Sequence, residues 1–226
     1  EMLVGQVEAL QPQTVIPGAS FVWFSHEENA RHNEEASHID RAWRRLQANV
    51  DADVIVLYPG ERWSLGAPHD TLASLRRYAA DYARLEAGRT LHASSSVDAE
   101  QLALDAAQWG ARLRSYNGVR MLGWLRSLGA LEPARVWITD HGRAYALSNE
   151  GLTEIDTAVR ACDVAMSSSA LDAVFRFPWG GNTLSVNGRV EYLPGGDAAR
   201  FRRWMSMSSY NNHGYRIGQM LPRLAS

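Results

Sequence analysis

The stretch "DVIVLYPG" at residues 53–60 limits the folds open to this chain more than any other feature. Its apolar run ends at a Pro-Gly pair, which is typical of a strand buried on both faces within a sheet that helices cover. Residues 37–50 before it carry apolar side chains at helical spacing, opened by Ser37. Two shorter apolar segments, "TVIP" (14–17) and "SFVWFS" (20–25), predict short strands ahead of that helix. Strand, helix and strand in this order predict an α/β unit.

Helices are predicted on both sides of this unit and in the middle of the chain. Residues 1–10 form an amphipathic pattern with no capping residue before it, so we expect the sequence to be part of a longer protein. Residues 69–85, 94–116 and 120–129 predict three further helices, and 88–96 a linker. The inner face of the 94–116 helix is expected to carry Leu102, Ala106, Trp109 and Leu113.

The last third has the pattern of a small α+β domain. "ARVWITDHGRAYAL" (134–147) predicts two strands joined at Asp140-His141-Gly142. "NTLSVNGRVEYL" (182–193) alternates apolar and polar residues around Asn187-Gly188, which predicts a hairpin with a type I′ turn. A helix is expected from Asp197 through Met207.

Together these patterns predict three parts. An α/β segment is expected over residues 1–65, a helical connecting region over 66–130 and the small α+β domain over 131–226. The boundary between the first part and the rest is expected between Glu61 and Ser96.

The amino-acid composition excludes some classes of function. A net charge of −2 argues against nucleic-acid binding driven by phosphate contacts, and no run near 18 apolar residues predicts a membrane span. The single cysteine, Cys162, has apolar neighbours and indicates a reducing compartment, so a cytoplasmic location is expected. All 23 basic residues are arginine. This fits either an anionic ligand bound through guanidinium groups or a bias in genomic base composition, and it excludes lysine catalysis.

A dense polar cluster follows the apolar segment at residues 20–25. Its members are His26, Glu27, Glu28, Asn29, His32 and Asn33. The histidines lie six residues apart, about 600° of helical rotation, so they do not share a helix face and a zinc site built from this stretch alone is not expected. One side chain of the cluster is expected to act as a general base or a single metal ligand, or else the cluster is a solvated loop.

Other signals for catalysis are weak. "SSSALDA" from Ser167 predicts a helix start with serine capping rather than a nucleophile. "PWGGN" (178–182) lacks the phosphate-binding glycine patterns and predicts a tight turn. "SYNNHGYR" (209–216) either lines a pocket or forms a surface turn.

Residues from about 5 to 63 resemble the closing part of a metallo-β-lactamase-fold protein. The similarity is greatest to the lactonase-like and sugar-nucleotide-hydroxylase-like branch. The positions that carry the resemblance are Pro17, Ser20, Phe24, Ser25, His26, Glu27, Glu28, Asn29 and Tyr58-Pro59-Gly60-Glu61. The resemblance implies that the α/β segment closes a sandwich of that family.

This resemblance implies a metal-dependent hydrolase or oxygenase acting on a small-molecule substrate. His26, Glu27 and Glu28 would then be catalytic, and Asn29, His32 and Asn33 would contact the substrate. The family's H-x-H-x-D-H motif is absent from the sequence. The resemblance therefore implies that zinc or iron is held outside this chain, by an upstream domain or a catalytic partner chain, and that this chain is the C-terminal portion of the enzyme.

Residues 163–193 resemble a sterol-carrier-type domain, which some metallo-β-lactamase-fold alkylsulfatases carry. Such domains enclose an apolar cavity that accepts alkyl chains. Either this cavity or an ordinary core is expected to be lined by Phe175, Phe177, Trp179, Leu184, Trp204 and Met205, with Trp179 as a substrate-binding residue. The resemblance implies a second reading of the chain, as a non-catalytic module that binds an apolar or amphipathic small molecule. A third reading is a subunit that docks a catalytic partner through the helix at residues 1–10.

Overall fold

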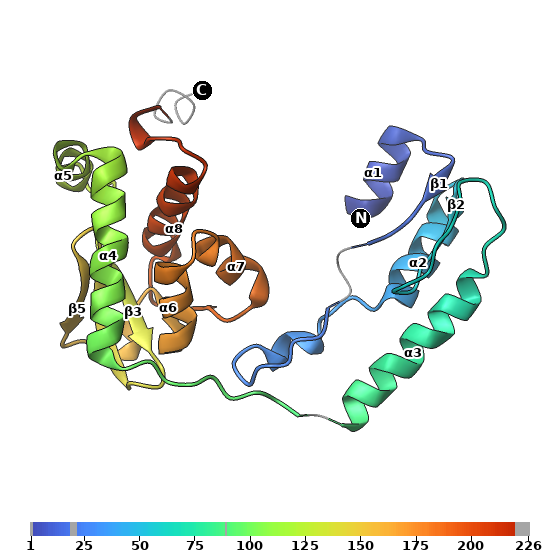
Figure 1. The fold of residues 1–226 in the computed structure, drawn as a ribbon, viewed down its shortest axis with the longest axis horizontal. Helices are drawn as coiled ribbons and strands as arrows, with labels where there is room; N and C mark the ends of the chain where they lie inside the picture. Colours follow the sequence, from blue (N-terminus) through green and yellow to red (C-terminus); the bar gives the residue numbers. More distant parts are fainter. Residues whose placement is uncertain (1, 19–21, 89, 220–226) are drawn as a thin grey trace. The chain divides into compact units, whose positions relative to one another are not determined.

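A computed structural model describes residues 2–18, 22–88 and 90–219 of the chain (Figure 1). Its contacts divide the chain into two compact units. The first unit comprises residues 1–25 and 30–92, and the second comprises 26–29 and 93–226. The four residues 26–29 therefore belong to the second unit although they are flanked in sequence by the first.

The first unit contains the predicted α/β element. Strand β1 pairs in parallel with β2, with Thr14 opposite Asp53, and helix α2 connects the two strands. The predicted strand–helix–strand order is confirmed. The elements of this unit are α1 (Met2–Leu10), β1 (Thr14–Val15), the 3₁₀ helix η1 (Ala30–Asn33), α2 (Ile39–Asn49), β2 (Asp53–Val54) and α3 (Thr71–Ala87).

Of the strand predictions in this unit, one is confirmed only in part and one is wrong. Only Asp53–Val54 of "DVIVLYPG" pairs as a strand, although Ile55 and Val56 are buried, because β1 offers just two residues as a partner. Residues 22–25 of "SFVWFS" form no strand, and residues 19–21 lie outside the described part of the chain. The N-cap of α2 is His38 rather than Ser37.

Helix α3 begins where the sequence predicted a helix. The carboxylate of Asp70 caps it by accepting the N–H of Ala73 at 2.9 Å, which satisfies one of the donors that a helix start leaves free. Of the helical region expected over 66–130, α3 belongs to the first unit, and the two later helices belong to the second.

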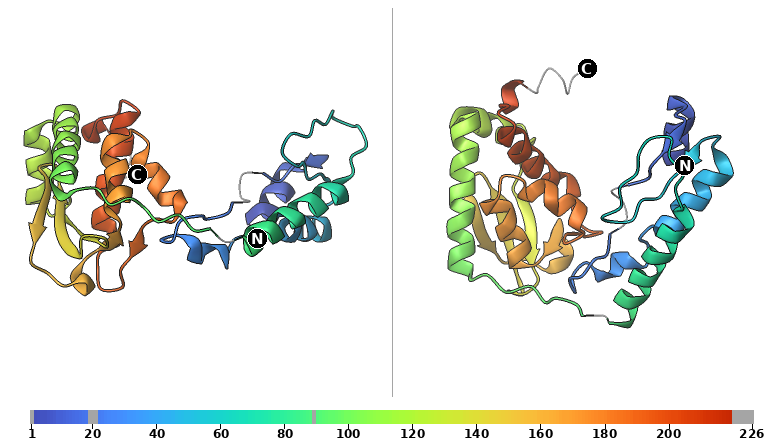
Figure 2. Two further views of the ribbon diagram at one scale, coloured as in Figure 1. Left: turned by 60° about the horizontal axis from the view of Figure 1, so that its bottom comes forward. Right: turned by 45° about the vertical axis from the view of Figure 1, so that its right-hand side comes forward.

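The second unit is a mixed sheet covered by helices (Figures 1 and 2). Its five strands lie in the order β5-β4-β3-β6-β7, with β3 and β6 parallel and the other neighbours antiparallel. Its elements are α4 (Ala99–Asn117), α5 (Val119–Ser127), β3 (Ala134–Ile138), β4 (Arg143–Ser148), β5 (Gly151–Ile155), the 3₁₀ helix η2 (Val159–Ala161), β6 (Val164–Met166), α6 (Ser168–Arg176), α7 (Gly180–Asn187), β7 (Glu191–Tyr192) and α8 (Ala198–Asn212).

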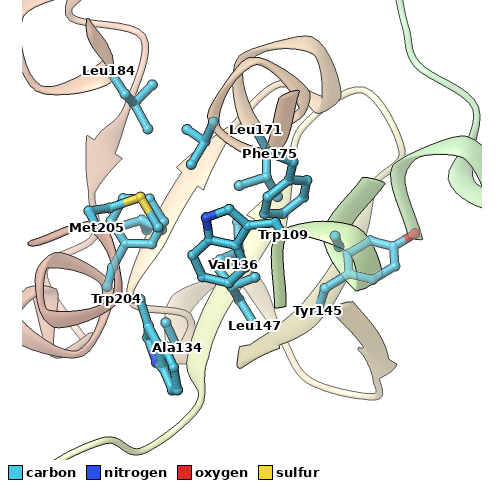
Figure 3. Close-up of a cluster of buried hydrophobic side chains, with 14 of the residues drawn as sticks. Trp109, Ala134, Val136, Tyr145, Leu147, Leu171, Phe175, Leu184, Trp204 and Met205 are labelled. Carbon is cyan, nitrogen blue, oxygen red and sulfur yellow. The ribbon is translucent and has the colours of Figure 1, made fainter. Parts of the chain in front are cut away.

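The core of this unit lies between the sheet and helices α4, α6 and α8 (Figure 3). Strand β3 alternates buried Ala134, Val136 and Ile138 with outward-facing residues, so one face of the sheet packs on the helices. The predicted inner face of α4 is confirmed, since its four residues are at most 2% exposed. The indole N–H of Trp109, at the centre of Figure 3, donates to the Ser208 hydroxyl at 3.1 Å.

The predicted hairpin at 182–193 is wrong. Residues Gly180–Asn187 form helix α7, and Gly188, with φ of +67°, ends that helix in the left-handed conformation. Asn-Gly suits a left-handed helix cap as well as a type I′ turn, so the local sequence does not separate the two. At the start of this helix, a Cβ on Gly180 would lie 2.2 Å from the carbonyl oxygen of Ala173 on α6, so the close approach of α6 requires glycine at this position.

Three other predictions for this unit are confirmed, whereas the tight turn expected at 178–182 is limited to Pro178 and Trp179, because helix α7 begins at Gly180. The two strands around Asp140-His141-Gly142 are β3 and β4, Ser167 caps α6, and α8 begins after Asp197. Cys162 is fully buried. Among residues 2–18, 22–88 and 90–219, no helix is both long and apolar enough to cross a membrane.

Candidate functional site

A group of polar side chains in the second unit surrounds the guanidinium of Arg189. This residue follows the glycine that ends α7, and its side chain is 15% exposed. Its Nε and Nη2 donate to Oε1 of Glu28 at 3.1 and 2.7 Å. Nη2 also lies 2.7 Å from the hydroxyl of Ser94 and 2.8 Å from that of Ser169.

Ser167 connects this group to helix α6. As the N-cap residue, its hydroxyl accepts the N–H of Ala170 at 3.3 Å and donates to Oε2 of Glu28 at 2.9 Å. The hydroxyl of Ser94 donates to Oε1 of the same carboxylate. We call four residues the Arg189 cradle: Ser94, Ser167 and Arg189, which bond the carboxylate, and Ser169, which accepts a hydrogen bond from Arg189.

The surroundings of Glu28 favour its charged form. Burial alone raises the pKa of this carboxyl, but hydrogen bonds from Arg189, Ser94 and Ser167 outweigh it and hold the pKa below its ordinary value. At neutral pH the cradle therefore holds a carboxylate ion.

Asn29 fastens the same short segment to the end of α7. Its Nδ2 donates to the carbonyl oxygen of Asn187 at 2.7 Å, and its Oδ1 accepts the N–H of His26 at 3.0 Å. The side chain of Asn187 in turn accepts the N–H of Arg189 at 3.0 Å. Asn29 thus binds the last residue of α7, and Glu28 binds Arg189, two residues further on.

A second polar group fixes the start of α6 to the sheet. Asp140, at the end of β3, accepts the N–H and the hydroxyl of Ser168 at 2.7 and 2.5 Å. Ser168 also accepts the N–H of Val97 at 2.8 Å, and His141 bonds the carbonyl oxygen of Val97 at 2.8 Å. These contacts join the turn after β3, the residue before Asp98 and the start of α6, so this group positions the serines of the cradle.

The polar cluster expected at residues 26–33 is divided between the two units. Glu28 and Asn29 bind within the second unit, as described above, and Glu27 beside them is exposed. In the first unit, Asn33 exchanges two hydrogen bonds of 2.8 Å with the backbone of Phe24. The ring of His32 lies 5.5 Å from the ring of Phe24. His32 and Asn33 therefore brace a loop of the first unit.

A pocket of about 290 Å³ lies between α7, β7 and α8 of the second unit. Its floor is apolar and formed by Leu184, Val190, Phe201 and Met205, each at most 9% exposed. Its rim is polar and carries Asn182, Ser185, Arg202, Ser206, Ser209 and Tyr210. We call it the α7–α8 pocket.

A smaller pocket of about 120 Å³ lies between α6 and α7. We call it the α6–α7 pocket. Trp179, predicted to bind substrate, lines this pocket together with Phe177 and is 53% exposed. Arg189 lines it as well, so it adjoins the cradle.

The six residues expected to line a cavity or a core therefore separate into three sets. Leu184 faces both pockets, and Met205 faces the α7–α8 pocket. Phe177 and Trp179 face the α6–α7 pocket alone, whereas Phe175 and Trp204 are fully buried core residues (Figure 3).

Arg189, Ser94 and Ser169 were not predicted as site residues. Two serine triplets, at 94–96 and 167–169, precede helices in the sequence, and an arginine follows the Asn-Gly pair. The sequence shows the serine triplets and the arginine, but it does not show that they meet. Arg189 lies 95 residues from Ser94 and 20 from Ser169, and only the fold brings them together.

Within the described ranges, no three side chains of His, Cys, Asp or Glu group so as to hold a metal ion. The divalent metal expected from the resemblance, held outside this chain, stays a prediction. Comparison of the chain with protein-family models, with curated protein sequences and with solved structures returned no match.

Proposed function

We propose that the second unit binds an amphipathic small molecule in the α7–α8 pocket. The observation that carries the proposal is the division of this pocket into an apolar floor and a polar rim. Ligand pockets typically combine an apolar lining with a few placed polar groups.

The floor is suited to an alkyl or similar chain. Phe201 and Met205 reach it from α8, Leu184 from α7 and Val190 from the segment before β7. Covering such a surface with a ligand is favourable by about 25 cal/mol per Å² of apolar area removed from water. Because Gly181 also lines the pocket, no Cβ reduces the space at that point of α7.

The rim suits a polar or anionic head group. The guanidinium of Arg202 lies 4.9 Å from the centre of the Tyr192 ring, which holds its charge at the mouth of the pocket. The hydroxyls of Ser206 and Ser209 line the same side. A carboxylate, sulfate or hydroxyl group is therefore the head group that we expect, and the resemblance of residues 163–193 to sterol-carrier-type domains supports the same ligand class.

Displacement of a fluorescent fatty-acid probe from the full chain tests this proposal. Ser185→Trp places an indole in the pocket from an exposed position on α7, and Val186→Trp places the same group beside it, where Val186 is 74% exposed and lines neither pocket. We expect the Kd of the probe to rise at least tenfold in Ser185→Trp and to stay unchanged in Val186→Trp. Absence of probe binding to the wild-type chain, or equal Kd values in the two variants, would contradict the proposal.

A catalytic role is a second proposal. It holds that the chain is the C-terminal portion of a metallo-β-lactamase-fold hydrolase or oxygenase. The observation that favours it is the parallel pairing of β1 and β2 around α2, which suits the closing part of such a sandwich. Reconstitution with a candidate upstream half tests it, by metal content and hydrolysis of lactone or sulfate ester substrates. A reconstituted complex with bound metal but no activity on any such substrate would count against it.

A further inference from the structure

The carboxylate in the Arg189 cradle belongs to Glu28, which lies in the short segment 26–29. Residues 26–29 group with the second unit, while the residues before and after them in sequence group with the first. Glu28 is thus a side chain brought to the cradle from outside the continuous stretch 93–226 that forms it.

The cradle has the chemistry of a receptor for anions. Arginine presents several N–H donors in a fixed fork, and here Nε and Nη2 both contact one carboxylate oxygen. Serine hydroxyls donate to both oxygens, and the N-terminus of α6 adds the positive end of a helix dipole. Each of these groups would contact the carboxylate of another molecule as well as that of Glu28.

The α6–α7 pocket indicates what such a molecule carries besides its charge. Arg189 is one of the residues that line this pocket, and the rest of the lining is mostly apolar. The lining residues are Ala170, Ala173, Phe177, Trp179, Gly180, Thr183, Leu184 and Asn187. A carboxylate bound by Arg189 would therefore place a short apolar chain in this pocket, which Glu28 does not do.

We propose that the Arg189 cradle binds the carboxylate of a small apolar acid, and that Glu28 competes with that ligand for the cradle. The site is distinct from the α7–α8 pocket, so this inference does not rest on the function proposed above. Only molecules in which Glu28 has left the cradle can bind the external acid. The apparent affinity therefore equals the intrinsic affinity multiplied by the fraction of such molecules.

Calorimetric titration of the full chain with hexanoate tests the proposal. Glu28→Gln removes the competing charge, and Glu27→Gln removes the same charge from the exposed neighbouring residue. We expect hexanoate to bind Glu28→Gln at least tenfold more tightly than the wild-type chain, and Glu27→Gln to behave as the wild type does. Adding Arg189→Gln to Glu28→Gln is expected to abolish binding. Equal Kd values in wild type and Glu28→Gln would overturn the proposal.

A second variant leaves the cradle intact, in case Glu28→Gln does not fold. Thr183→Trp fills the α6–α7 pocket from an exposed position on α7. In this variant we expect the affinity for hexanoate to fall at least tenfold and the weaker affinity for acetate to stay unchanged. Unchanged hexanoate binding would mean that the pocket does not hold the chain of the acid, and the assignment would be wrong.

Two further titrations separate this site from other sources of binding. Inorganic phosphate is expected to bind Glu28→Gln more weakly than hexanoate does, and the reverse order would replace the apolar acid by a phosphate ligand. Ser185→Trp blocks the α7–α8 pocket and is expected to leave hexanoate binding unchanged. Loss of hexanoate binding in Ser185→Trp would place the acid in the α7–α8 pocket and overturn the inference, whereas failure of the fatty-acid probe to bind leaves the hexanoate result intact.

Discussion

The two units of the chain are stabilised in different ways. The buried apolar cluster of the first unit consists of Val7, Leu46 and Val54, and its two strands pair over two residues each. In the second unit, one continuous cluster joins the sheet to α4, α6 and α8. Because stability rises with the apolar area removed from water, the second unit is expected to be the more stable of the two.

The first unit contains a carboxylate that accepts several hydrogen bonds, that of Glu61. This side chain accepts hydrogen bonds from the backbone of Tyr58 at 2.8 Å, from Ser74 at 2.8 Å and from Arg77 at 2.7 Å. His69 lies 3.4 Å away. Glu61 follows the turn after the buried run and links that turn to α3. The first unit therefore combines a small apolar core with a hydrogen-bonded carboxylate. We expect the stabilities of the two units to respond differently to mutation and to pH.

The largest effect is expected in the core of the second unit. Trp109→Ala removes a side chain that is 1% exposed and packs against the rings of Phe175 and Trp204, so we expect the free energy of unfolding of this unit to fall by about 3–5 kcal/mol. Trp124→Ala, at a position 52% exposed, is the control. Denaturant unfolding followed by NMR should show the transition of the second unit shifted and that of the first unchanged. One shared transition that shifts as a whole would contradict the division into two cores.

A smaller effect is expected from Glu61→Gln in the first unit. The hydrogen bonds from Tyr58 and Ser74, with His69 and Arg77 nearby, lower the pKa of Glu61 from an ordinary 4.5 to about 2. A depressed pKa in the folded state means that the carboxylate stabilises the unit above about pH 4.5 and that this contribution is lost as pH falls toward 2. Glu61→Gln should therefore lower the Tm of the first unit at pH 7 and have little effect near pH 2. Glu86→Gln, on an exposed part of α3, is the control, and a Tm difference that does not depend on pH would contradict this assignment.

The smallest effect is expected at Asp172, and it has the opposite sign. Burial on α6 raises the pKa of this carboxyl, and the neighbouring Asp105 on α4 raises it further. A raised pKa means that the folded unit loses stability as pH rises through the ordinary value toward the folded one. Asp172→Asn should therefore raise the Tm of the second unit slightly at pH 7, and Asp105→Asn should give a similar gain that does not add to it. A fall in Tm for Asp172→Asn would show that its contact with Arg176 outweighs the repulsion.

Sequence periodicity predicted the helices of both units well, because burial of one helical face leaves a regular pattern. Helix α4 is the clearest case, since each of its predicted inner residues is buried. The sequence predicted strands β3 and β4, which pair with each other over five residues, and β1. It predicted β2 too long, because only Asp53 and Val54 pair with β1, and it missed β5 although β5 pairs with β4 over five residues. Helix α7 was missed because the Asn187-Gly188 pair suits a left-handed helix cap as well as a hairpin turn, and the close approach of α6 to Gly180 leaves no local pattern in the sequence.

The candidate site was predictable only in part. Glu28 and Asn29 stood out in the sequence as members of a polar cluster, and the structure gives both of them partners in the second unit. Arg189 looked like an ordinary residue after a turn, and its serine neighbours looked like helix caps. Their role depends on contacts between residues up to 161 positions apart, which sequence patterns do not contain.

The most direct test of ligand binding by the second unit is a titration of the ¹⁵N-labelled full chain with dodecanoate, followed by ¹H–¹⁵N NMR. We predict saturable shifts that are largest at the amides of Leu184, Val190 and Met205, around the α7–α8 pocket. Shifts absent from α7 and α8, or confined to residues of the first unit, would contradict the account.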